Sequence, residues 1–127
     1  MGCDIHLFLE QKAPGEMKWR YVKVFDNCEV DSRNYPRFAL LAGVRGAGPA
    51  AIGLPVDMSP EVAEHAAGWG ADGHSHSHGP LDAALPIFMQ TCRLTEISTL
   101  PNVACWQLFG IVPQYANQFR LVFWFDN

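Results

Sequence analysis

The segment 119–125 constrains the fold most, because aromatic and aliphatic side chains alternate through it with a period of two residues. Odd-numbered residues would point to one face of a strand and even-numbered residues to the other. Residues 3–10 alternate in the same way. Turn residues at 13–16 and a second apolar run at 19–25 predict a hairpin with that first strand. The sequence therefore predicts an antiparallel sheet that contains both terminal strands.

Helix signals lie between the strands. Residues 35–42 have a Pro in the first turn and are followed by Gly43, and residues 59–68 begin with Ser-Pro-Glu. A further turn or two is predicted after Pro80, ending near Pro86, and another helix at 101–109. We expect short helices packed on one face of the sheet, joined by long ordered loops.

The length and the net charge of the chain limit the classes of function that it can have. The 127 residues, 49% of them hydrophobic, fit a single α+β domain spanning 1–127. The net charge of −4 argues against general nucleic-acid binding, which needs a basic surface. No apolar run approaches the roughly 18 residues of a membrane span, and the first residues lack the basic start of a secretory signal. We expect a cytoplasmic protein without a membrane partner, and a homo-oligomer stays open.

The middle of the chain is acidic and rich in histidine. Residues 46–92 contain neither Lys nor Arg, and they hold four of the five histidines. Five acidic residues give this segment a net charge of −5: Asp57, Glu61, Glu64, Asp72 and Asp82. Such a background suits a divalent cation better than a polyanion.

The run Asp-Gly-His-Ser-His-Ser-His at 72–78 is the strongest chemical motif. In an extended strand, His74 and His76 would share a face and could converge on one ion, with the serines between and after them as hydrogen-bond donors to the imidazoles. Asp72 or His6 would complete the site. The sequence predicts a Zn²⁺ or Mn²⁺ site here, against the alternative of a solvent-exposed loop.

Two further groups are candidate functional residues. Asp4 and His6 share a face of the first strand, so that Asp4 could be a general base or could orient His6, whereas Cys3 would point to the other face. Arg33 precedes a predicted helix and could stabilise an anion. The predicted ligand-binding residues are Arg33, Asn34, Tyr35 and Trp69, and Trp69 and Trp124 are both candidates to stack on a planar ligand. An ion pair of Arg33 with an acid, and a helix cap at Asn34, are the structural alternatives.

Four segments together carry a resemblance: Met-Gly-Cys-Asp-Ile-His at 1–6, the Arg-Asn-Tyr segment at 33–45, Asp-Gly-His-Ser-His-Ser at 72–77 and the closing residues 120–127. With them the chain resembles a group of small bacteriophage and prophage proteins. The resemblance implies a phage source and action in the host cytoplasm. It also implies that the group's pattern includes Asp4, His6, Arg33, Asn34, Tyr35, Asp72, His74 and His76. His78 departs from that pattern.

These observations lead to three hypotheses. The first is a small phage enzyme that hydrolyses a phosphorylated or nucleotide-type small molecule with metal assistance, a host defence signal being one candidate substrate. In it, His74, His76 and either His6 or Asp72 hold the ion, Asp4 and His6 act in catalysis, and Arg33 stabilises charge. The second is a protein that sequesters such a signal without turnover. The third is an inhibitor that docks on a host protein.

Overall fold

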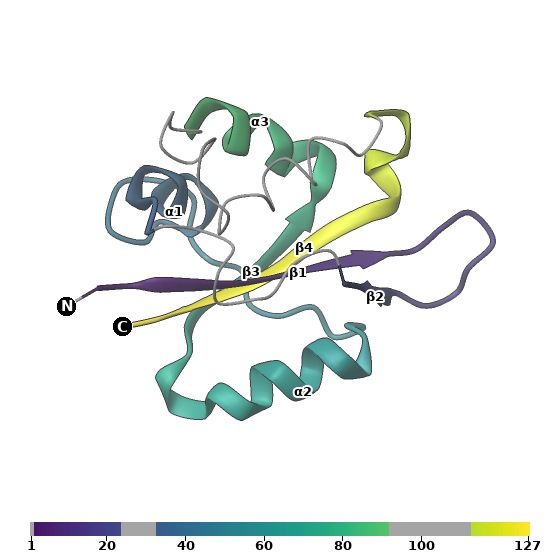
Figure 1. Cartoon of the computed structure of the whole chain (residues 1–127), viewed down its shortest axis with the longest axis horizontal. Coiled ribbons are helices and arrows are strands. Elements are labelled where there is room, and N and C mark those ends of the chain that lie inside the picture. The colour runs from purple at the N-terminus through teal and green to yellow at the C-terminus, as the bar shows by residue number, and fades with distance from the viewer. Residues whose placement is uncertain (1, 24–32, 92–112) are drawn as a thin grey trace.

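The computed structural model describes residues 2–23, 33–91 and 113–127. Its four strands form one antiparallel sheet in the order β2-β1-β4-β3 (Figure 1). The predicted α+β class, with both terminal strands in the sheet, is confirmed. The strands are β1 (Asp4–Gln11), β2 (Arg20–Val22), β3 (His74–Pro80) and β4 (Phe119–Asp126), and the helices are α1 (Tyr35–Ala42), α2 (Pro60–Trp69) and α3 (Leu81–Thr91). Short 3₁₀ helices, Gly70–Asp72 and Pro113–Gln118, precede β3 and β4.

The pairing of β1 with β4 decides which side chains share a face. Asp4 lies opposite Asp126 and His6 lies opposite Trp124, so residues of equal parity point the same way on both strands. The odd-numbered residues form the larger apolar core, and the even-numbered ones, Phe8 and Trp124 among them, form a second core on the other face. The predicted alternation of both strands is confirmed.

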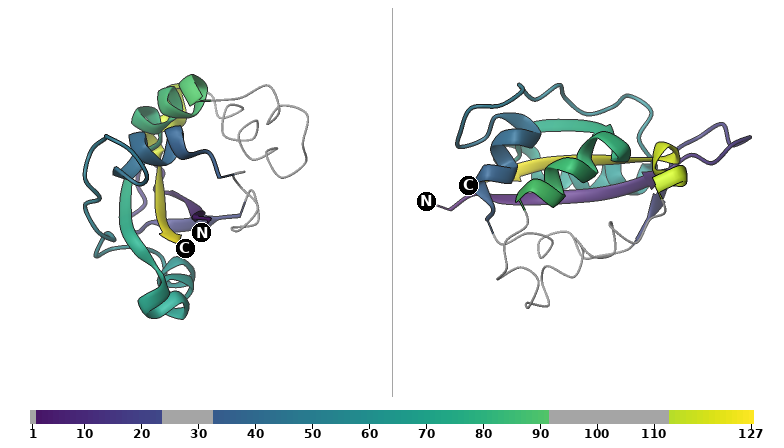
Figure 2. Two further views of the ribbon diagram at one scale, coloured as in Figure 1. Left: turned by 90° about the vertical axis from the view of Figure 1, so that its left-hand side faces the viewer. Right: turned by 90° about the horizontal axis from the view of Figure 1, so that it is seen from above.

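The helices are divided between the two faces of the sheet. Helices α1 and α3 cover the odd-numbered face, and α2 covers the even-numbered face (Figures 1 and 2). The expectation placed all helices on one face, whereas the structure places α2 on the other. The physical reason is that Phe8 and Trp124 are large apolar side chains on the even-numbered face, and burying them requires a cover.

Helix α1 has the predicted bounds because its capping residues fix both ends. The Asn34 side chain accepts a hydrogen bond from the backbone N–H of Arg37 at 3.1 Å. Gly43 ends the helix in the left-handed region at φ 70°, a conformation that costs glycine little. Buried Asn34 also donates to the carbonyl of Thr91 at the end of α3, which ties the two helices together.

Helices α2 and α3 both extend beyond their predicted ends. Helix α2 starts as predicted after its cap, Ser59, but continues past Gly68 by one residue. The predicted end of α3 near Pro86 is wrong, because α3 continues to Thr91. Its buried face, which includes Phe88, extends beyond Pro86, so packing outweighs the hydrogen bond that the proline cannot make.

The histidine run forms the edge strand β3, which contains a β-bulge. His74 pairs with Phe125 and Ser77 pairs with Phe123, so two residues of β3 face Trp124. Ser75 in the bulge has φ 54°, in the left-handed region. The adjacent loop covers the edge, since the N–H of Gly53 donates to the carbonyl of His76 at 2.7 Å.

The predicted helix at 101–109 lies outside the described residues, as do Cys28, Cys92 and Cys105. Cys3 lies on the odd-numbered face, opposite to Asp4 and His6, as predicted, and it is fully buried there. Among the helices that are described, none is both long enough and apolar enough to cross a membrane.

Candidate functional site

Polar residues gather at one end of the sheet, where β1 begins and β4 ends and where both chain termini lie (Figure 1). Asp4 and Asp126 are directly opposed there, and like charges in this arrangement repel each other. Each carboxylate has its own cationic or imidazole partner: Arg33 binds Asp4, and His6 binds Asp126. We call this group of four residues, Asp4, His6, Arg33 and Asp126, the sheet-end cluster.

The Arg33 guanidinium donates hydrogen bonds to the Asp4 carboxylate from two nitrogens. Nε lies 2.9 Å from Oδ1 and Nη2 lies 3.4 Å from Oδ2. This pairing raises the pKa of Arg33. The Arg33 side chain is nevertheless 54% exposed, so water and salt screen the pair. A Cβ atom on Gly2 would overlap this guanidinium, so a larger residue at position 2 would displace the end of the Arg33 side chain.

His6 is held by Asp126 rather than by the predicted Asp4. Its Nε2 lies 2.5 Å from Oδ2 of Asp126. The imidazole is 1% exposed while the carboxylate is 18% exposed, so Asp126 is the member of the pair that solvent reaches. The indole of Trp69 packs against the imidazole, with ring centroids 4.1 Å apart. The prediction named Asp4 as the carboxylate that orients His6, whereas the carboxylate that binds the imidazole is Asp126, and Asp4 binds Arg33.

Asn34 and Tyr35, both predicted ligand-binding residues, have structural partners. Asn34 is fully buried as the cap of α1, the structural alternative for this residue. The Tyr35 hydroxyl accepts a hydrogen bond from the N–H of Cys3 at 3.2 Å, and Arg45 lies 5.2 Å above its ring. These contacts fasten α1 and its neighbours to the start of β1. Burial raises the pKa of the Cys3 thiol, and Cys3 points away from His6, so the two do not form a nucleophile pair.

The bulge in β3 separates the two histidines that were expected to share a face. His74 stacks on Phe125, and His76 stacks on Trp124, which point to opposite faces of β4. Burial, and secondarily the nearby charge of His74, lower the pKa of His76 below its ordinary value. His78 lies 2.9 Å from the carbonyl oxygen of Gly53 through Nδ1, which gives it a role in fastening the edge loop.

The predicted metal ligands do not form a cluster in this arrangement. His6 and His76 both lie beside the Trp124 ring, at centroid distances of 6.1 and 6.0 Å, on the two strands that flank β4. Asp72 is exposed on the 3₁₀ helix before β3. Within the described ranges, no three His, Cys, Asp or Glu side chains are grouped so that they could hold an ion.

Trp69 is the predicted stacking residue that remains partly exposed. It lines a shallow surface pocket on α2 together with Glu64, His65 and Gly68. Trp124 also carries an indole, but it is fully buried and its Nε1–H has no partner among the described residues. A planar ligand could therefore stack on Trp69, whereas Trp124 belongs to the core.

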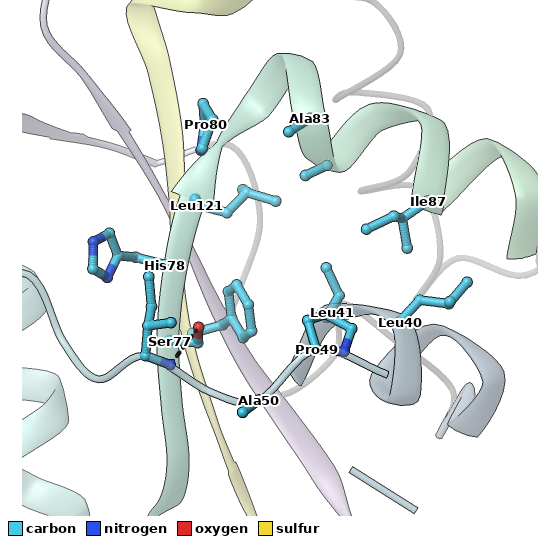
Figure 3. Close-up of a pocket in the computed structure, with 14 residues that line it drawn as sticks. Leu40, Leu41, Pro49, Ala50, Ser77, His78, Pro80, Ala83, Ile87 and Leu121 are labelled. Atoms are coloured by element: carbon cyan, nitrogen blue, oxygen red, sulfur yellow. Dashed lines mark hydrogen bonds between the residues drawn. The ribbon is translucent and has the colours of Figure 1, made fainter. Parts of the chain in front are cut away.

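A second hollow lies on the opposite face of the sheet and is apolar. Its volume is about 240 Å³, and it lies between α1, α3 and the edge strand β3 (Figure 3). Leu41, Ile87 and Phe123 line it, and the imidazole of His78 points away from it. Ser77 and His78 of the histidine run are among its lining residues, but none of the residues predicted to bind the metal or the ligand is.

Sequence reasoning missed Asp126 and Asn127, and it gave Ser75 only a supporting role. The position of Asp126 could have been found, because antiparallel pairing of the two terminal strands brings the end of the last strand to the start of the first. The pairing of Glu10 with Arg120 follows from the same register. The bulge at Ser75 has no comparable signal in the sequence.

A scan against protein-family models found no match, and neither did searches of curated proteins and of solved structures.

Proposed function

We propose that the chain binds a small phosphorylated molecule of nucleotide type at the sheet-end cluster and hydrolyses it. The observation that carries the proposal is the placement of two complementary pairs side by side across β1 and β4. Arg33–Asp4 supplies an exposed guanidinium, and His6–Asp126 supplies an oriented carboxylate. An anion-binding group beside a proton acceptor is the minimum that phosphoester hydrolysis requires.

Arg33 is the anion-binding residue of the proposal. Its guanidinium is a planar fork that fits two phosphate oxygens as well as it fits Asp4. Because the pair with Asp4 is exposed, a phosphate can compete for Arg33 without desolvating a buried charge. Asp4 then keeps Arg33 pointed along the sheet end when the ligand is absent.

Asp126 is the proton acceptor of the proposal. His6 holds Oδ2 in place, and the carboxylate reaches solvent, so Oδ1 can accept a proton from an attacking water. The water oxygen bonds to phosphorus, the bond to the leaving oxygen breaks, and charge on the phosphoryl group is stabilised by Arg33. A base in this position typically contributes a factor of about 10²–10⁴ to the rate.

The divalent ion expected from the sequence stays part of the hypothesis. The ligands predicted from the sequence were His6, Asp72, His74 and His76, but the described residues do not group them around one ion, and His6 and His74 are engaged by other side chains. Assays with Zn²⁺, with Mn²⁺ and with a chelator test its contribution separately from that of Asp126.

Sequestration without turnover is the second candidate function. It is favoured by the burial of His6 under Trp69, which leaves the exposed side of that indole as a stacking surface. The resemblance to phage proteins supports nucleotide-type defence signals as ligands for either function.

Turnover of a phosphodiester panel tests the proposal. Untagged protein is incubated with bis(p-nitrophenyl) phosphate and with linear and cyclic nucleotides, with and without each metal. We expect turnover that falls about 10²-fold or more in Asp126→Asn and at least about tenfold in Arg33→Gln. Arg20→Gln is the matched control, because Arg20 is also 54% exposed and paired with an acid, Glu16.

Two results would contradict hydrolysis. One is the absence of product from every substrate under every metal condition. The other is an unchanged rate in both Asp126→Asn and Arg33→Gln. Binding of a nucleotide that is recovered intact after denaturation would support sequestration instead.

A further inference from the structure

Ser75, His74 and Asn127 form a continuous hydrogen-bonded chain at the start of β3. The Oγ of Ser75 lies 2.9 Å from Nδ1 of His74, and Nε2 of His74 lies 3.1 Å from Oδ1 of Asn127. A hydroxyl, an imidazole and an amide oxygen in this order have the connectivity of a serine nucleophile, its base and the group that orients the base.

The Asn127 oxygen sets the protonation pattern of the chain. An amide oxygen only accepts, so Nε2 of His74 must carry the proton that it receives. Nδ1 of the neutral imidazole is then unprotonated and accepts from the Ser75 hydroxyl. This is the tautomer in which His74 can remove the proton of Ser75, while stacking on Phe125 holds the ring in place.

The backbone at Ser75 is strained, and the β-bulge is the cause. Arg33, Arg45 and Ser75 are the non-glycine residues with positive φ among those that the structure describes. A serine at φ 54° is less favourable than a glycine, and such strain is concentrated at functional sites. Ser77, two residues on, differs: it is 4% exposed, and its Oγ accepts from the N–H of Ile52.

We propose that Ser75 is the nucleophile of a covalent step in phosphoester hydrolysis, with His74 as its base and Asn127 as a positioning residue. This inference rests on the proposed function, and it adds a phosphoserine intermediate to it. The Oγ–P bond forms as the bond from phosphorus to the leaving oxygen breaks. The Ser75 proton passes to Nδ1 of His74 and from there to the leaving oxygen. Water then attacks the phosphoserine: the water oxygen bonds to phosphorus as the Oγ–P bond breaks, and the water proton passes to Nδ1 of His74 and from there to Oγ of Ser75.

The position of the chain in the fold is consistent with that step. His74 pairs with Phe125, one residue before Asp126, so the Ser75 chain and the sheet-end cluster lie at the same end of the sheet. The chain lies on the face of Phe125, whereas the Asp126 carboxylate lies on the face of His6, so His74 serves as the base in both steps.

Labelling with a fluorophosphonate, a reagent that phosphonylates activated serines, tests the inference without knowledge of the substrate. We expect a single adduct on Ser75, located by mass spectrometry of peptides. Labelling should be lost in Ser75→Ala and in Ser75→Gly and should fall at least tenfold in His74→Gln. Ser77→Ala is the matched control and should label at the wild-type rate. Circular dichroism confirms that each variant is folded, and Ser75→Gly also removes the strain.

Variants of Asn127 separate orientation of the base from a purely structural contact. In Asn127→Asp the carboxylate stabilises protonated imidazole, so the midpoint of the pH profile of labelling should rise. In Asn127→Leu the labelling rate should fall at all pH values. An unchanged profile in both variants would remove Asn127 from the proposal.

Two outcomes separate this inference from the proposed function. Phosphodiester turnover without an adduct on Ser75, or with equal labelling in His74→Gln, overturns the nucleophile and leaves hydrolysis by activated water standing. An adduct on Ser75 without turnover of any phosphodiester supports the nucleophile and contradicts the proposed function.

Discussion

Single residues at the end of the sheet are defined by the partners that hold them. Asp4 and Asp126 face each other across two strands, and each is compensated separately, by Arg33 and by His6. Because one pair is exposed and the other nearly buried, the two carboxylates have different tasks in the proposed reaction. Asp4 positions the guanidinium, and Asp126 receives the proton.

The depressed pKa of His76 gives a prediction about pH. Burial disfavours the charged imidazole, so the pKa of His76 lies below its ordinary value of 6.5, and the unfolded chain binds this proton more tightly than the folded one. The free energy of unfolding should therefore decrease as the pH falls from the ordinary value toward the folded value.

The test compares urea unfolding of wild type and of His76→Gln at about pH 7 and about pH 5. Wild type should lose more stability than the variant over this range. Gln90→Ala, a change at an exposed residue of α3 without a titratable side chain, should keep the wild-type pH dependence. Equal losses in wild type and in His76→Gln would show that His76 is not desolvated.

For single residues, the sequence indicates which polar side chains have specific partners better than it indicates what each of them does. Asn34 was expected as a ligand-binding residue or a helix cap, and the structure shows the cap. His6 was expected to be oriented by a carboxylate, which it is, but the carboxylate comes from the other end of the chain. Local spacing identifies polar residues in an apolar strand and does not identify partners 120 residues away.

Elements of secondary structure were predictable where capping and periodicity agreed. Helix α1 has both an Asn cap and a terminal glycine and was placed correctly. For helix α3 the sequence predicts an end near Pro86, because proline is a typical stop signal, and the helix continues to Thr91. Local propensity was overridden there by burial of Leu81 and Phe88 on a shared face.

Pro86 therefore provides a prediction for α3. It is exposed, and it removes a hydrogen bond inside the helix. Pro86→Ala should restore that bond and raise the free energy of unfolding by about 1–2 kcal/mol, part of the helix penalty of proline being offset by the greater freedom of the unfolded chain. Urea denaturation measures this change. A loss of stability would mean that the proline ring makes a contact that α3 needs.

The histidine run was the least predictable element. Strict alternation would have put His74 and His76 on one face, but the bulge inserts one residue and turns them apart. At the edge of β3 the backbone N–H of Gly53 donates a hydrogen bond to the carbonyl of His76. This contact joins residues far apart in the sequence, so no local sequence pattern indicates it. The predicted metal site required strict alternation of side chains along β3, and the bulge interrupts that alternation.

A buried ion pair on the even-numbered face of the sheet connects several elements of the molecule. Glu10 is fully buried and accepts from Arg120 at 2.7 Å and from the backbone N–H of Ser59, the cap of α2, at 2.6 Å. Arg120 also binds Asp57, and its guanidinium lies 4.1 Å above the Trp19 ring. These contacts join β1, β4 and the start of α2.

Removing the buried acid should be far more costly than removing the exposed one. Glu10→Gln leaves the Arg120 charge buried without its main partner and should lower the free energy of unfolding by about 3–5 kcal/mol. Asp57→Asn should lower it by less than about 1 kcal/mol, because Asp57 is 59% exposed and solvent screens its pair with Arg120. Denaturant unfolding of both variants gives the comparison, and similar losses would contradict the importance of burial.

For the molecule as a whole, we propose that a phosphorylated ligand binds and reacts at the end of the sheet where β1 begins and β4 ends. The most direct measurement is a nuclear magnetic resonance titration of ¹⁵N-labelled protein with inorganic phosphate and with a nucleotide monophosphate. We expect saturable amide shifts at Asp4, Arg33, Ser75 and Asp126, abolished in Arg33→Gln and retained in Arg20→Gln. Shifts confined to the apolar pocket beside Leu41 and Phe123, or no saturable shift anywhere, would contradict it.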